Sequence, residues 1–202
     1  MIYDLVFEGG GAKGFVLVGA YEEFARRGHT HGRLLGTSAG AITAALTAAG
    51  YTPAEMLAAL NERDAAGKSV MSAFLGEPAA FTPQQVKDSA IRKLLKEVNV
   101  KLLPDLLEDK LDDALAGLMA QNPRSRHLFS FVERGGWYSA DAFVAWLRAK
   151  LDAGQRQGTP RKFSGMTLGQ FYAATQVELA VVASDTTGQR MLVLNHRTAP
   201  DC

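Results

Sequence analysis

The sequence predicts an α/β fold, a three-layer α/β/α domain with a mostly parallel central sheet and a helical insertion. Three observations lead to this prediction: two short apolar runs that each end in a glycine turn, a helical pattern after each turn, and a helix-rich middle region. With 202 residues, 47% of them hydrophobic, the chain can bury one sizeable core. We therefore expect a single domain over residues 1–202, incomplete at its carboxyl end, with the insertion at about 64–134.

The first predicted elements form a βαβ unit. Residues 3–7 are an apolar run that predicts a buried strand, and the glycine-rich loop 9–14 follows it. A helix is expected from this loop to about Arg27, because apolar residues recur on one face at helical spacing. Residues 33–35 predict a second short buried strand. The right-handed crossover would make these two strands parallel neighbours.

The second turn, Gly36-Thr37-Ser38-Ala39-Gly40, places a serine between two glycines. An alanine-rich helix is expected from Ala39 to Ala49, and Gly50 is expected to end it. In a nucleophile elbow the serine occupies a sharp strand-to-helix turn, and flanking glycines remove the Cβ atoms that would clash there. Ser38 is therefore the candidate nucleophile, with Gly36 and Gly40 in support. An ordinary turn serine is the alternative.

The glycine loop is expected beside this elbow, because the carboxyl ends of parallel strands meet at one edge of the sheet. The backbone N–H groups of Gly10 and Gly11 are the candidate oxyanion hole, since they precede a helix and can point at a developing negative oxygen. Gly9 and Gly14 support the loop. We interpret Lys13 as a solvated charge at the helix start.

Two nucleotide-binding interpretations of the loop fit less well. A dinucleotide fingerprint requires an acidic residue about 20 positions later, and none occurs between Glu23 and Glu55. A phosphate-binding loop requires Lys and Ser or Thr after its last glycine, whereas Phe15 and Val16 follow Gly14. A glycine turn without any ligand is the remaining alternative.

Taken together, the two motifs resemble those of the patatin-like phospholipase family. Residues 9–14 look like its Gly-Gly-Gly-x-Lys/Arg-Gly loop, residues 36–40 look like its Gly-x-Ser-x-Gly elbow, and residues 179–188 are similar to the strand and turn that precede its last catalytic segment. The resemblance implies a lipid acyl hydrolase of the phospholipase A or esterase type. It also implies a Ser-Asp dyad without a catalytic histidine, no cofactor and usually no metal, and a phospholipid or other acyl-lipid substrate at a peripheral membrane surface.

The sequence departs from the family at the aspartate, which normally belongs to Asp-Gly-Gly or Asp-Gly-Ala. No Asp-Gly dipeptide occurs in the 202 residues. Asp185 stands at a predicted strand end, but residues 179–195 are typical of a hairpin, so we interpret it as a turn residue. The catalytic aspartate is therefore expected beyond residue 202, on a carboxyl-terminal continuation or on a partner chain that completes the sheet. The remaining candidates are predicted to be solvated helix charges, namely Asp105, Asp109, Asp112, Asp113 and Asp141.

Two other functions stay open. One is a non-catalytic lipid-binding or regulatory protein that keeps the elbow without turnover. The other is a Ser-His-Asp α/β-hydrolase with His196 and Asp185 as partners, although in that fold the oxyanion loop and elbow follow several strands rather than the first two. We expect His29 and His31 in loops and His127 in a basic cluster, and none of them has metal-ligand spacing.

The composition narrows the remaining classes of function and location. The formal net charge of +1 gives no indication of nucleic-acid binding. Cys202 is the single cysteine, so no disulfide within the chain is expected. We expect no signal peptide, because the first predicted strand begins at the start of the sequence, and no apolar run reaches 18 residues. We expect a soluble protein, cytoplasmic or secreted without a classical signal peptide, with at most peripheral membrane contact.

In and before the insertion, Thr52 and Thr82 each begin a capping-box pattern with a proline in the first turn, which predicts helix starts. The stripe of leucines between residues 102 and 115 predicts a packing face in preference to a lipid-binding surface. Residues 70–76 form a short apolar segment, for which a mobile lid over an acyl site and a buried loop are equally good interpretations.

Overall fold

The computed structural model describes residues 1–11, 14–97 and 105–202, with only the backbone at 105–109. The predicted mixed α/β class with a mostly parallel sheet is confirmed. The chain divides into two compact units, a sheet unit of residues 1–71 and 145–202 and a helical unit of residues 72–144. Residues 64–71, which the sequence placed in the insertion, belong to the sheet unit. The expectation of one domain with an insertion at 64–134 stays a prediction.

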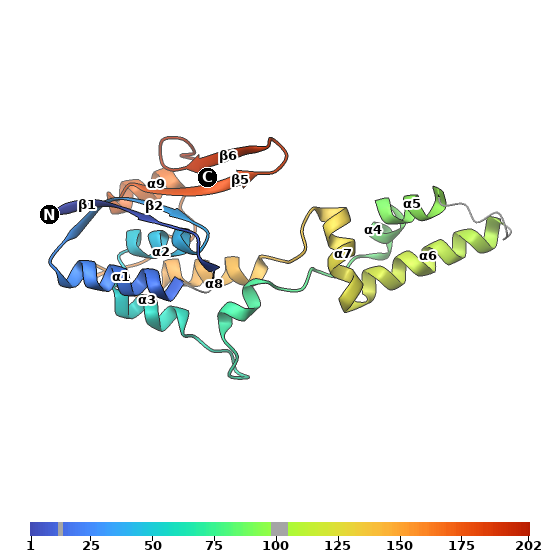
Figure 1. Cartoon of the computed structure of the whole chain (residues 1–202), viewed down its shortest axis with the longest axis horizontal. Coiled ribbons are helices and arrows are strands. Elements are labelled where there is room, and N and C mark those ends of the chain that lie inside the picture. The colour runs from blue at the N-terminus through green and yellow to red at the C-terminus, as the bar shows by residue number, and fades with distance from the viewer. Residues whose placement is uncertain (12–13, 98–104) are drawn as a thin grey trace. The chain divides into compact units, whose positions relative to one another are not determined.

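The sheet unit is built on four strands in the order β1-β2-β5-β6 (Figure 1). Their bounds are β1 Ile2–Phe7, β2 Thr30–Thr37, β5 Leu179–Asp185 and β6 Arg190–Leu194. The first three strands are parallel, and β6 pairs antiparallel with β5 as the second arm of a hairpin. The predicted βαβ unit and the predicted hairpin are therefore confirmed. His31 lies within β2, so its predicted place in a loop is wrong.

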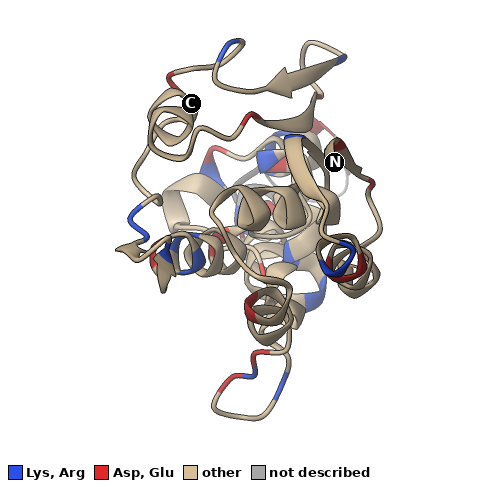
Figure 2. Ribbon diagram, turned by 90° about the vertical axis from the view of Figure 1, so that its left-hand side faces the viewer, with Lys and Arg blue, Asp and Glu red and all other residues tan. Residues whose placement is uncertain are grey.

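Helices α1 (Gly14–Arg26), α2 (Ala39–Ala48) and α3 (Pro53–Leu60) lie on one side of this sheet (Figure 1). Both parallel connections advance across the sheet in the same direction, and right-handed crossovers then place their helices on the same face. The alanines and glycine of α2 let it approach the sheet closely, and Ala44 and Ala48 are fully buried. Lys/Arg and Asp/Glu are interspersed along the ribbon rather than gathered by sign (Figure 2).

The rest of the sheet unit connects α3 to β5. Its elements are the β3–β4 hairpin (Gln155–Arg156 and Thr159–Pro160) and α9 (Leu168–Thr175). The 3-10 helix η2 (Val70–Phe74) and helix α8 (Asp141–Asp152) run across the two points at which the chain divides into units. The predicted helix start at Thr52 is confirmed, since its hydroxyl and the Glu55 carboxylate form a capping box.

Strand β1 is an edge strand, so the prediction of a buried strand at residues 3–7 is wrong. Ile2 and Val6 are 77% and 73% exposed, whereas Phe7, on the face that α2 covers, is buried. On the same open face, Met191 of β6 is 70% exposed. The face of the sheet that carries Val6 and Met191 is thus open at β1 and at β6.

The helical unit contains α4 (Pro83–Lys87), α5 (Ala90–Glu97), α6 (Asp105–Gln121) and α7 (Pro123–Arg134). Its core consists of Val86, Ile91, Ala116, Ala120 and Phe129. The predicted capping box at Thr82 is confirmed. Helix α6 begins, within the described residues, at Asp105.

Helix α6 packs through a different face from the one predicted. Leu111 and Leu115 are 56% and 41% exposed, while Ala116 and Ala120 are buried. The small alanine side chains let α6 lie close to the neighbouring helices. Leu111 and Leu115 lie on a different side of α6 and are turned away from the core. Asp112 is only 8% exposed, so its predicted solvation is also wrong. The other leucine side chains of the stripe, at 102, 103, 106 and 107, lie outside the described residues.

Candidate active site

Ser38 occupies the sharp turn between β2 and α2. Its backbone has φ 53° and ψ −123°, a combination that costs a non-glycine residue about 1–3 kcal/mol. Its side chain makes no capping hydrogen bond to the helix, although its carbonyl oxygen accepts one from Ala41 N at 2.9 Å. The residue is exposed. The turn therefore holds a hydroxyl at the surface without using it for capping.

The two glycines of this turn are required by close backbone contacts. A Cβ atom on Gly36 would lie 2.4 Å from the carbonyl oxygen of Gly40. A Cβ atom on Gly40 would lie 2.2 Å from the carbonyl oxygen of Phe7, at the end of β1. Neither position can accept a side chain without a backbone shift. The first turn of α2 is thus pressed against both β2 and β1.

The glycine loop that follows β1 lies beside the elbow, as expected. A Cβ atom on Gly9 would be 3.4 Å from the Cβ atom of Ser38, and one on Gly14 would be 3.9 Å from that of Ala39. Gly11 has φ +53°, in the region that favours glycine. Helices α1 and α2 both start here, and neither has an acidic residue in its first turn to offset the positive end of its dipole. Lys13 lies outside the described residues.

Asp185 is the last residue of β5, directly before the hairpin turn. Its carboxylate accepts hydrogen bonds from the Gly188 N–H at 2.8 Å and from Arg190 Nε at 3.1 Å. These bonds, that of Gly188 foremost, lower the pKa of Asp185 and make it a weaker base. Thr37 is paired with Val182, so Asp185 lies three positions farther along its strand. Within the described residues, no carboxylate forms a hydrogen bond with the Ser38 hydroxyl.

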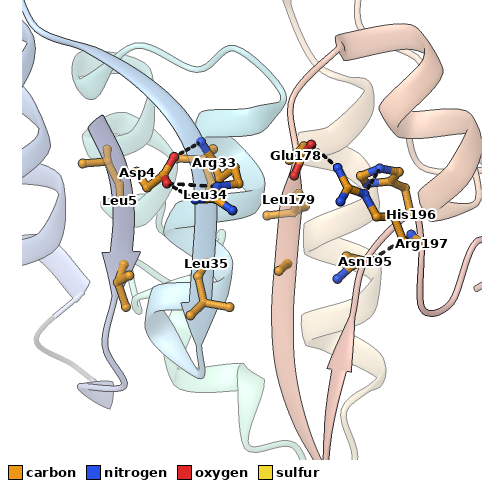
Figure 3. Close-up of a pocket in the computed structure, with 12 residues that line it drawn as sticks. Asp4, Leu5, Arg33, Leu34, Leu35, Glu178, Leu179, Asn195, His196 and Arg197 are labelled. Atoms are coloured by element: carbon orange, nitrogen blue, oxygen red, sulfur yellow. Dashed lines mark hydrogen bonds and ion pairs between the residues drawn. The ribbon is translucent and has the colours of Figure 1, made fainter. Parts of the chain in front are cut away.

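His196 lies at the opposite edge of the sheet, so it cannot complete a triad with Ser38. It lines a depression of about 380 Å³ that also includes Asp4, Arg33 and Glu178 (Figure 3). Glu178 directly precedes β5, and His196 follows β6, which runs antiparallel to β5, whereas Ser38 follows the carboxyl-terminal end of β2. The His196 ring stacks on Tyr172 with ring centroids 3.8 Å apart. The Ser-His-Asp interpretation is therefore wrong for these residues.

The sequence did not indicate the role of Arg161, which anchors the other end of α2. Its side chain is 1% exposed, and it donates to the carbonyl oxygens of Ala49 at 3.1 Å and Gly50 at 2.8 Å. It also pairs with Glu55 at 3.0 Å and lies 3.9 Å above the Tyr51 ring. These partners of Arg161 are more than 100 residues away in the sequence, so no local sequence pattern predicts the contact.

The described residues contain no cluster of three or more side chains suited to hold a metal ion. Among the helices that the structure describes, none combines the length and the apolar character needed to cross a bilayer.

Comparisons with known proteins find relatives of which this chain matches only a part. The chain is 52% identical over 64 residues to the uncharacterized protein YqhO of Bacillus subtilis, a match that covers 32% of this chain and 22% of YqhO. Among solved structures, it is similar to ExoU of Pseudomonas aeruginosa in complex with SpcU, with 21% identity and a TM-score of 0.44. For VipD of Legionella pneumophila these values are 16% and 0.41. The similarity covers 100% and 96% of this chain but only 36% and 39% of those proteins.

The family comparison covers nearly the whole chain, because the family model named patatin-like phospholipase matches residues 5–199. This range includes the glycine loop, the elbow and the β5–β6 hairpin. The motifs that suggested the resemblance are thus part of a match that extends over both units of the structure. The chain belongs to the patatin-like phospholipase family.

Proposed function

We propose that the protein is a lipid acyl hydrolase of the phospholipase A or esterase type, with Ser38 as its nucleophile. The observation that carries the proposal is the strained, exposed turn at Ser38, whose hydroxyl is not used for helix capping. The serine oxygen forms a bond to the ester carbonyl carbon of an acyl lipid, and the alcohol part leaves as an acyl-enzyme forms. Water then releases the fatty acid and restores the serine.

The backbone N–H groups of Gly10 and Gly11 stabilise the negative oxygen of each tetrahedral intermediate in this proposal. Two features of the structure support the assignment: the glycine loop lies against Ser38 through Gly9, and α1 and α2 both begin at this edge of the sheet. Helix N-termini carry partial positive charge and free N–H groups. Gly14, Gly36 and Gly40 allow the close approach, and Lys13 is a supporting charge of the loop.

The base that accepts the serine proton is supplied, in this proposal, by an aspartate beyond residue 202 or on a partner chain. The support is that the carboxylate of Asp185 is engaged by Gly188 and Arg190 and has a lowered pKa. Without a base, a serine hydroxyl is a weak nucleophile. The chain spans 22–39% of the lengths of the relatives named above, so the activity of the whole protein is part of the proposal.

The engagement of Asp185 by Gly188 and Arg190 also favours a second candidate function. In this alternative the protein binds lipid or acts as a regulator, and it does not hydrolyse esters. The two candidates differ in whether Ser38 reacts when a base is provided. Small bases such as imidazole or formate can replace a missing carboxylate if the nucleophile and the oxyanion site are in place. Chemical rescue of the 202-residue chain therefore separates them.

The experiment measures hydrolysis of a p-nitrophenyl acyl ester at increasing imidazole or formate concentration. We expect negligible hydrolysis without added base, and a rate that rises with the base in the unchanged chain but not in Ser38→Ala. A fluorophosphonate probe should form its adduct on Ser38, as mapped by mass spectrometry.

The matched control is Ser164→Ala, since the Ser164 hydroxyl donates to Asp152 at 2.6 Å and is not at a strand end. This variant should be labelled and rescued like the unchanged chain. Equal rescue in Ser38→Ala, or an adduct on another serine, would show that the nucleophile is wrongly assigned. Lipid binding without rescue or labelling would favour the non-catalytic candidate.

A further inference from the structure

The turn end of the β5–β6 hairpin extends past the elbow (Figure 1). Thr37, the residue before Ser38, is paired with Val182, whereas the last pair of the hairpin is Asp185 with Arg190. At about 3.3 Å per residue, this last pair lies about 10 Å farther along the strand direction than Thr37. Open α/β sheets bind ligands outside the carboxyl ends of their strands, so a substrate at Ser38 lies beside this end of the hairpin.

The side chains of this last pair lie on the face of the sheet that α2 covers. Leu179, which is buried and paired with the buried Leu34, points to this face. Asp185 is an even number of positions later in the same strand, so it points to the same face. Arg190 is directly opposite Asp185 in an antiparallel pair and shares its face. The arginine is therefore on the side of the sheet on which α2 begins after Ser38.

The guanidinium group of Arg190 is oriented through one nitrogen only. Its Nε atom donates to Asp185 Oδ2 at 3.1 Å, and Asp185 Oδ1 accepts from the Gly188 N–H at 2.8 Å. A Cβ atom on Gly188 would lie 3.2 Å from Arg190 Nε, so the turn fits closely around the pair. Among the described residues, neither Nη atom has a hydrogen-bond partner. The two Nη atoms can therefore donate to two oxygens of one phosphate group.

The charges around this arginine favour an anionic ligand. The Arg190 side chain is 70% exposed and that of Asp185 is 23% exposed, so the pair presents its cationic member to solvent. Helices α1 and α2 begin at this end of the sheet with no acidic residue in their first turns, and their N-termini carry partial positive charge. Glu8, the acidic residue that follows β1, is two strands away from β5.

We infer that Arg190 binds the phosphate of the lipid substrate and thereby selects a phosphate-bearing glycerolipid over a neutral acyl ester. The inference rests on the proposed function, because it assigns the headgroup end of the substrate that Ser38 attacks. In a glycerophospholipid the glycerol carbons separate the phosphate from the ester carbonyl groups, so the phosphate-binding residue should lie near the nucleophile without touching it. Arg190 is two strands from β2, about 10 Å away, and its side chain is directed back toward β5 by Asp185. Asp185 is a positioning residue for Arg190.

The test measures binding to the Ser38→Ala chain, so that no hydrolysis occurs and failure of the inference is distinct from failure of chemical rescue. Titration calorimetry compares dihexanoyl phosphatidic acid with dihexanoylglycerol, two lipids that differ only in the phosphate. We expect tighter binding of the phosphatidic acid, and about tenfold weaker binding of it in Arg190→Met, because charge-assisted hydrogen bonds are lost. Arg190→Lys should recover only part of this loss, since an ammonium group cannot make the bidentate contact. Binding of dihexanoylglycerol should not change.

The matched control is Arg197→Met, because Arg197 is 69% exposed and pairs with Glu178 at 2.6 Å, directly before β5 and at the opposite end of this strand from Asp185. This variant should bind like the parent. Inorganic phosphate alone should bind more weakly than the phosphatidic acid, which distinguishes a headgroup from a free anion. The inference is overturned by equal binding of the two lipids in the parent, absence of binding included, or by inorganic phosphate that binds as tightly as the lipid. Equal losses in Arg190→Met and Arg197→Met, or an equal loss for both lipids in Arg190→Met, would also overturn it.

Discussion

The two ends of helix α2 are built in opposite ways. At its start, Ser38 adopts a strained backbone conformation and its hydroxyl makes no capping hydrogen bond. At its end, Gly50 adopts φ +80°, and the buried guanidinium of Arg161 donates to the carbonyl oxygens of Ala49 and Gly50. The hydroxyl group at the amino-terminal end makes no capping bond, whereas the carbonyl oxygens at the carboxyl-terminal end accept hydrogen bonds. The difference indicates that the strain at the serine is tolerated because the rest of the helix is firmly held.

The largest expected effect comes from adding a side chain where the backbone at the start of α2 contacts the end of β1. Gly40→Ala should lower the free energy of unfolding by about 3 kcal/mol or more, because its Cβ atom would lie 2.2 Å from the Phe7 carbonyl oxygen. Urea denaturation measures the change. Gly19→Ala on α1 is the control, since nothing lies within 4 Å of its Cβ position, and it should stabilise by about 0.5–1 kcal/mol. Similar values for both variants would refute the close packing of the elbow.

The next effect concerns the distal anchor. Arg161→Met should lower the free energy of unfolding by about 2–3 kcal/mol, because the carbonyl oxygens of Ala49, Gly50 and Ala153 lose their donor while Glu55 can return to solvent. Arg33→Met removes an arginine whose pair with Asp4 is exposed, and it should change urea denaturation little. If the two substitutions had equal effects, the distal end of α2 would not be the stronger anchor.

A smaller effect of opposite sign is expected at the serine. Ser38→Gly should raise the free energy of unfolding by about 1 kcal/mol, because glycine adopts φ 53° without strain. Ala45→Gly, in the middle of α2, should instead lower it, since glycine weakens a helix interior. Thermal and urea denaturation of the two variants measure the signs. A destabilised Ser38→Gly protein would mean that the turn is not strained.

The smallest effect is a pH dependence at the distal anchor. Burial opposes ionisation of Glu55, but hydrogen bonds from Arg161 and Thr52 outweigh it and hold the pKa of Glu55 below its ordinary value of 4.5. The unfolded chain therefore binds more protons in this range, and the stability contributed by Glu55 is present above pH 4.5 and is lost as the pH falls through the lowered pKa.

Denaturation between neutral pH and pH 3 should show a shallower loss of stability in Glu55→Gln than in the unchanged chain. The difference should become smaller when Arg161→Met is already present, since the arginine is the main partner that lowers the pKa of Glu55 while the hydrogen bonds from Thr52 remain. A difference of unchanged size in that background would assign the lowered pKa to Thr52 instead of Arg161.

Local sequence determined the elements around the site. The glycine loop, the serine between two glycines and the right-handed βαβ connection predicted which turns meet at one edge of the sheet, because strand direction and crossover handedness follow from backbone geometry. The capping boxes at Thr52 and Thr82 were predicted for the same reason, since each involves residues only three positions apart. The hairpin around Asp185 was also predicted from neighbouring residues.

Only the tertiary structure decided which faces of these elements are buried. An apolar run such as residues 3–7 is compatible with a central or an edge strand, and Val6 proved exposed because no described helix covers its face. On α6 the alanines, not Leu111 and Leu115, face the core, because close helix packing favours small side chains. The burial of Arg161 depends on partners more than 100 residues distant. Burial depends on contacts between distant segments, and local sequence patterns carry no information about them.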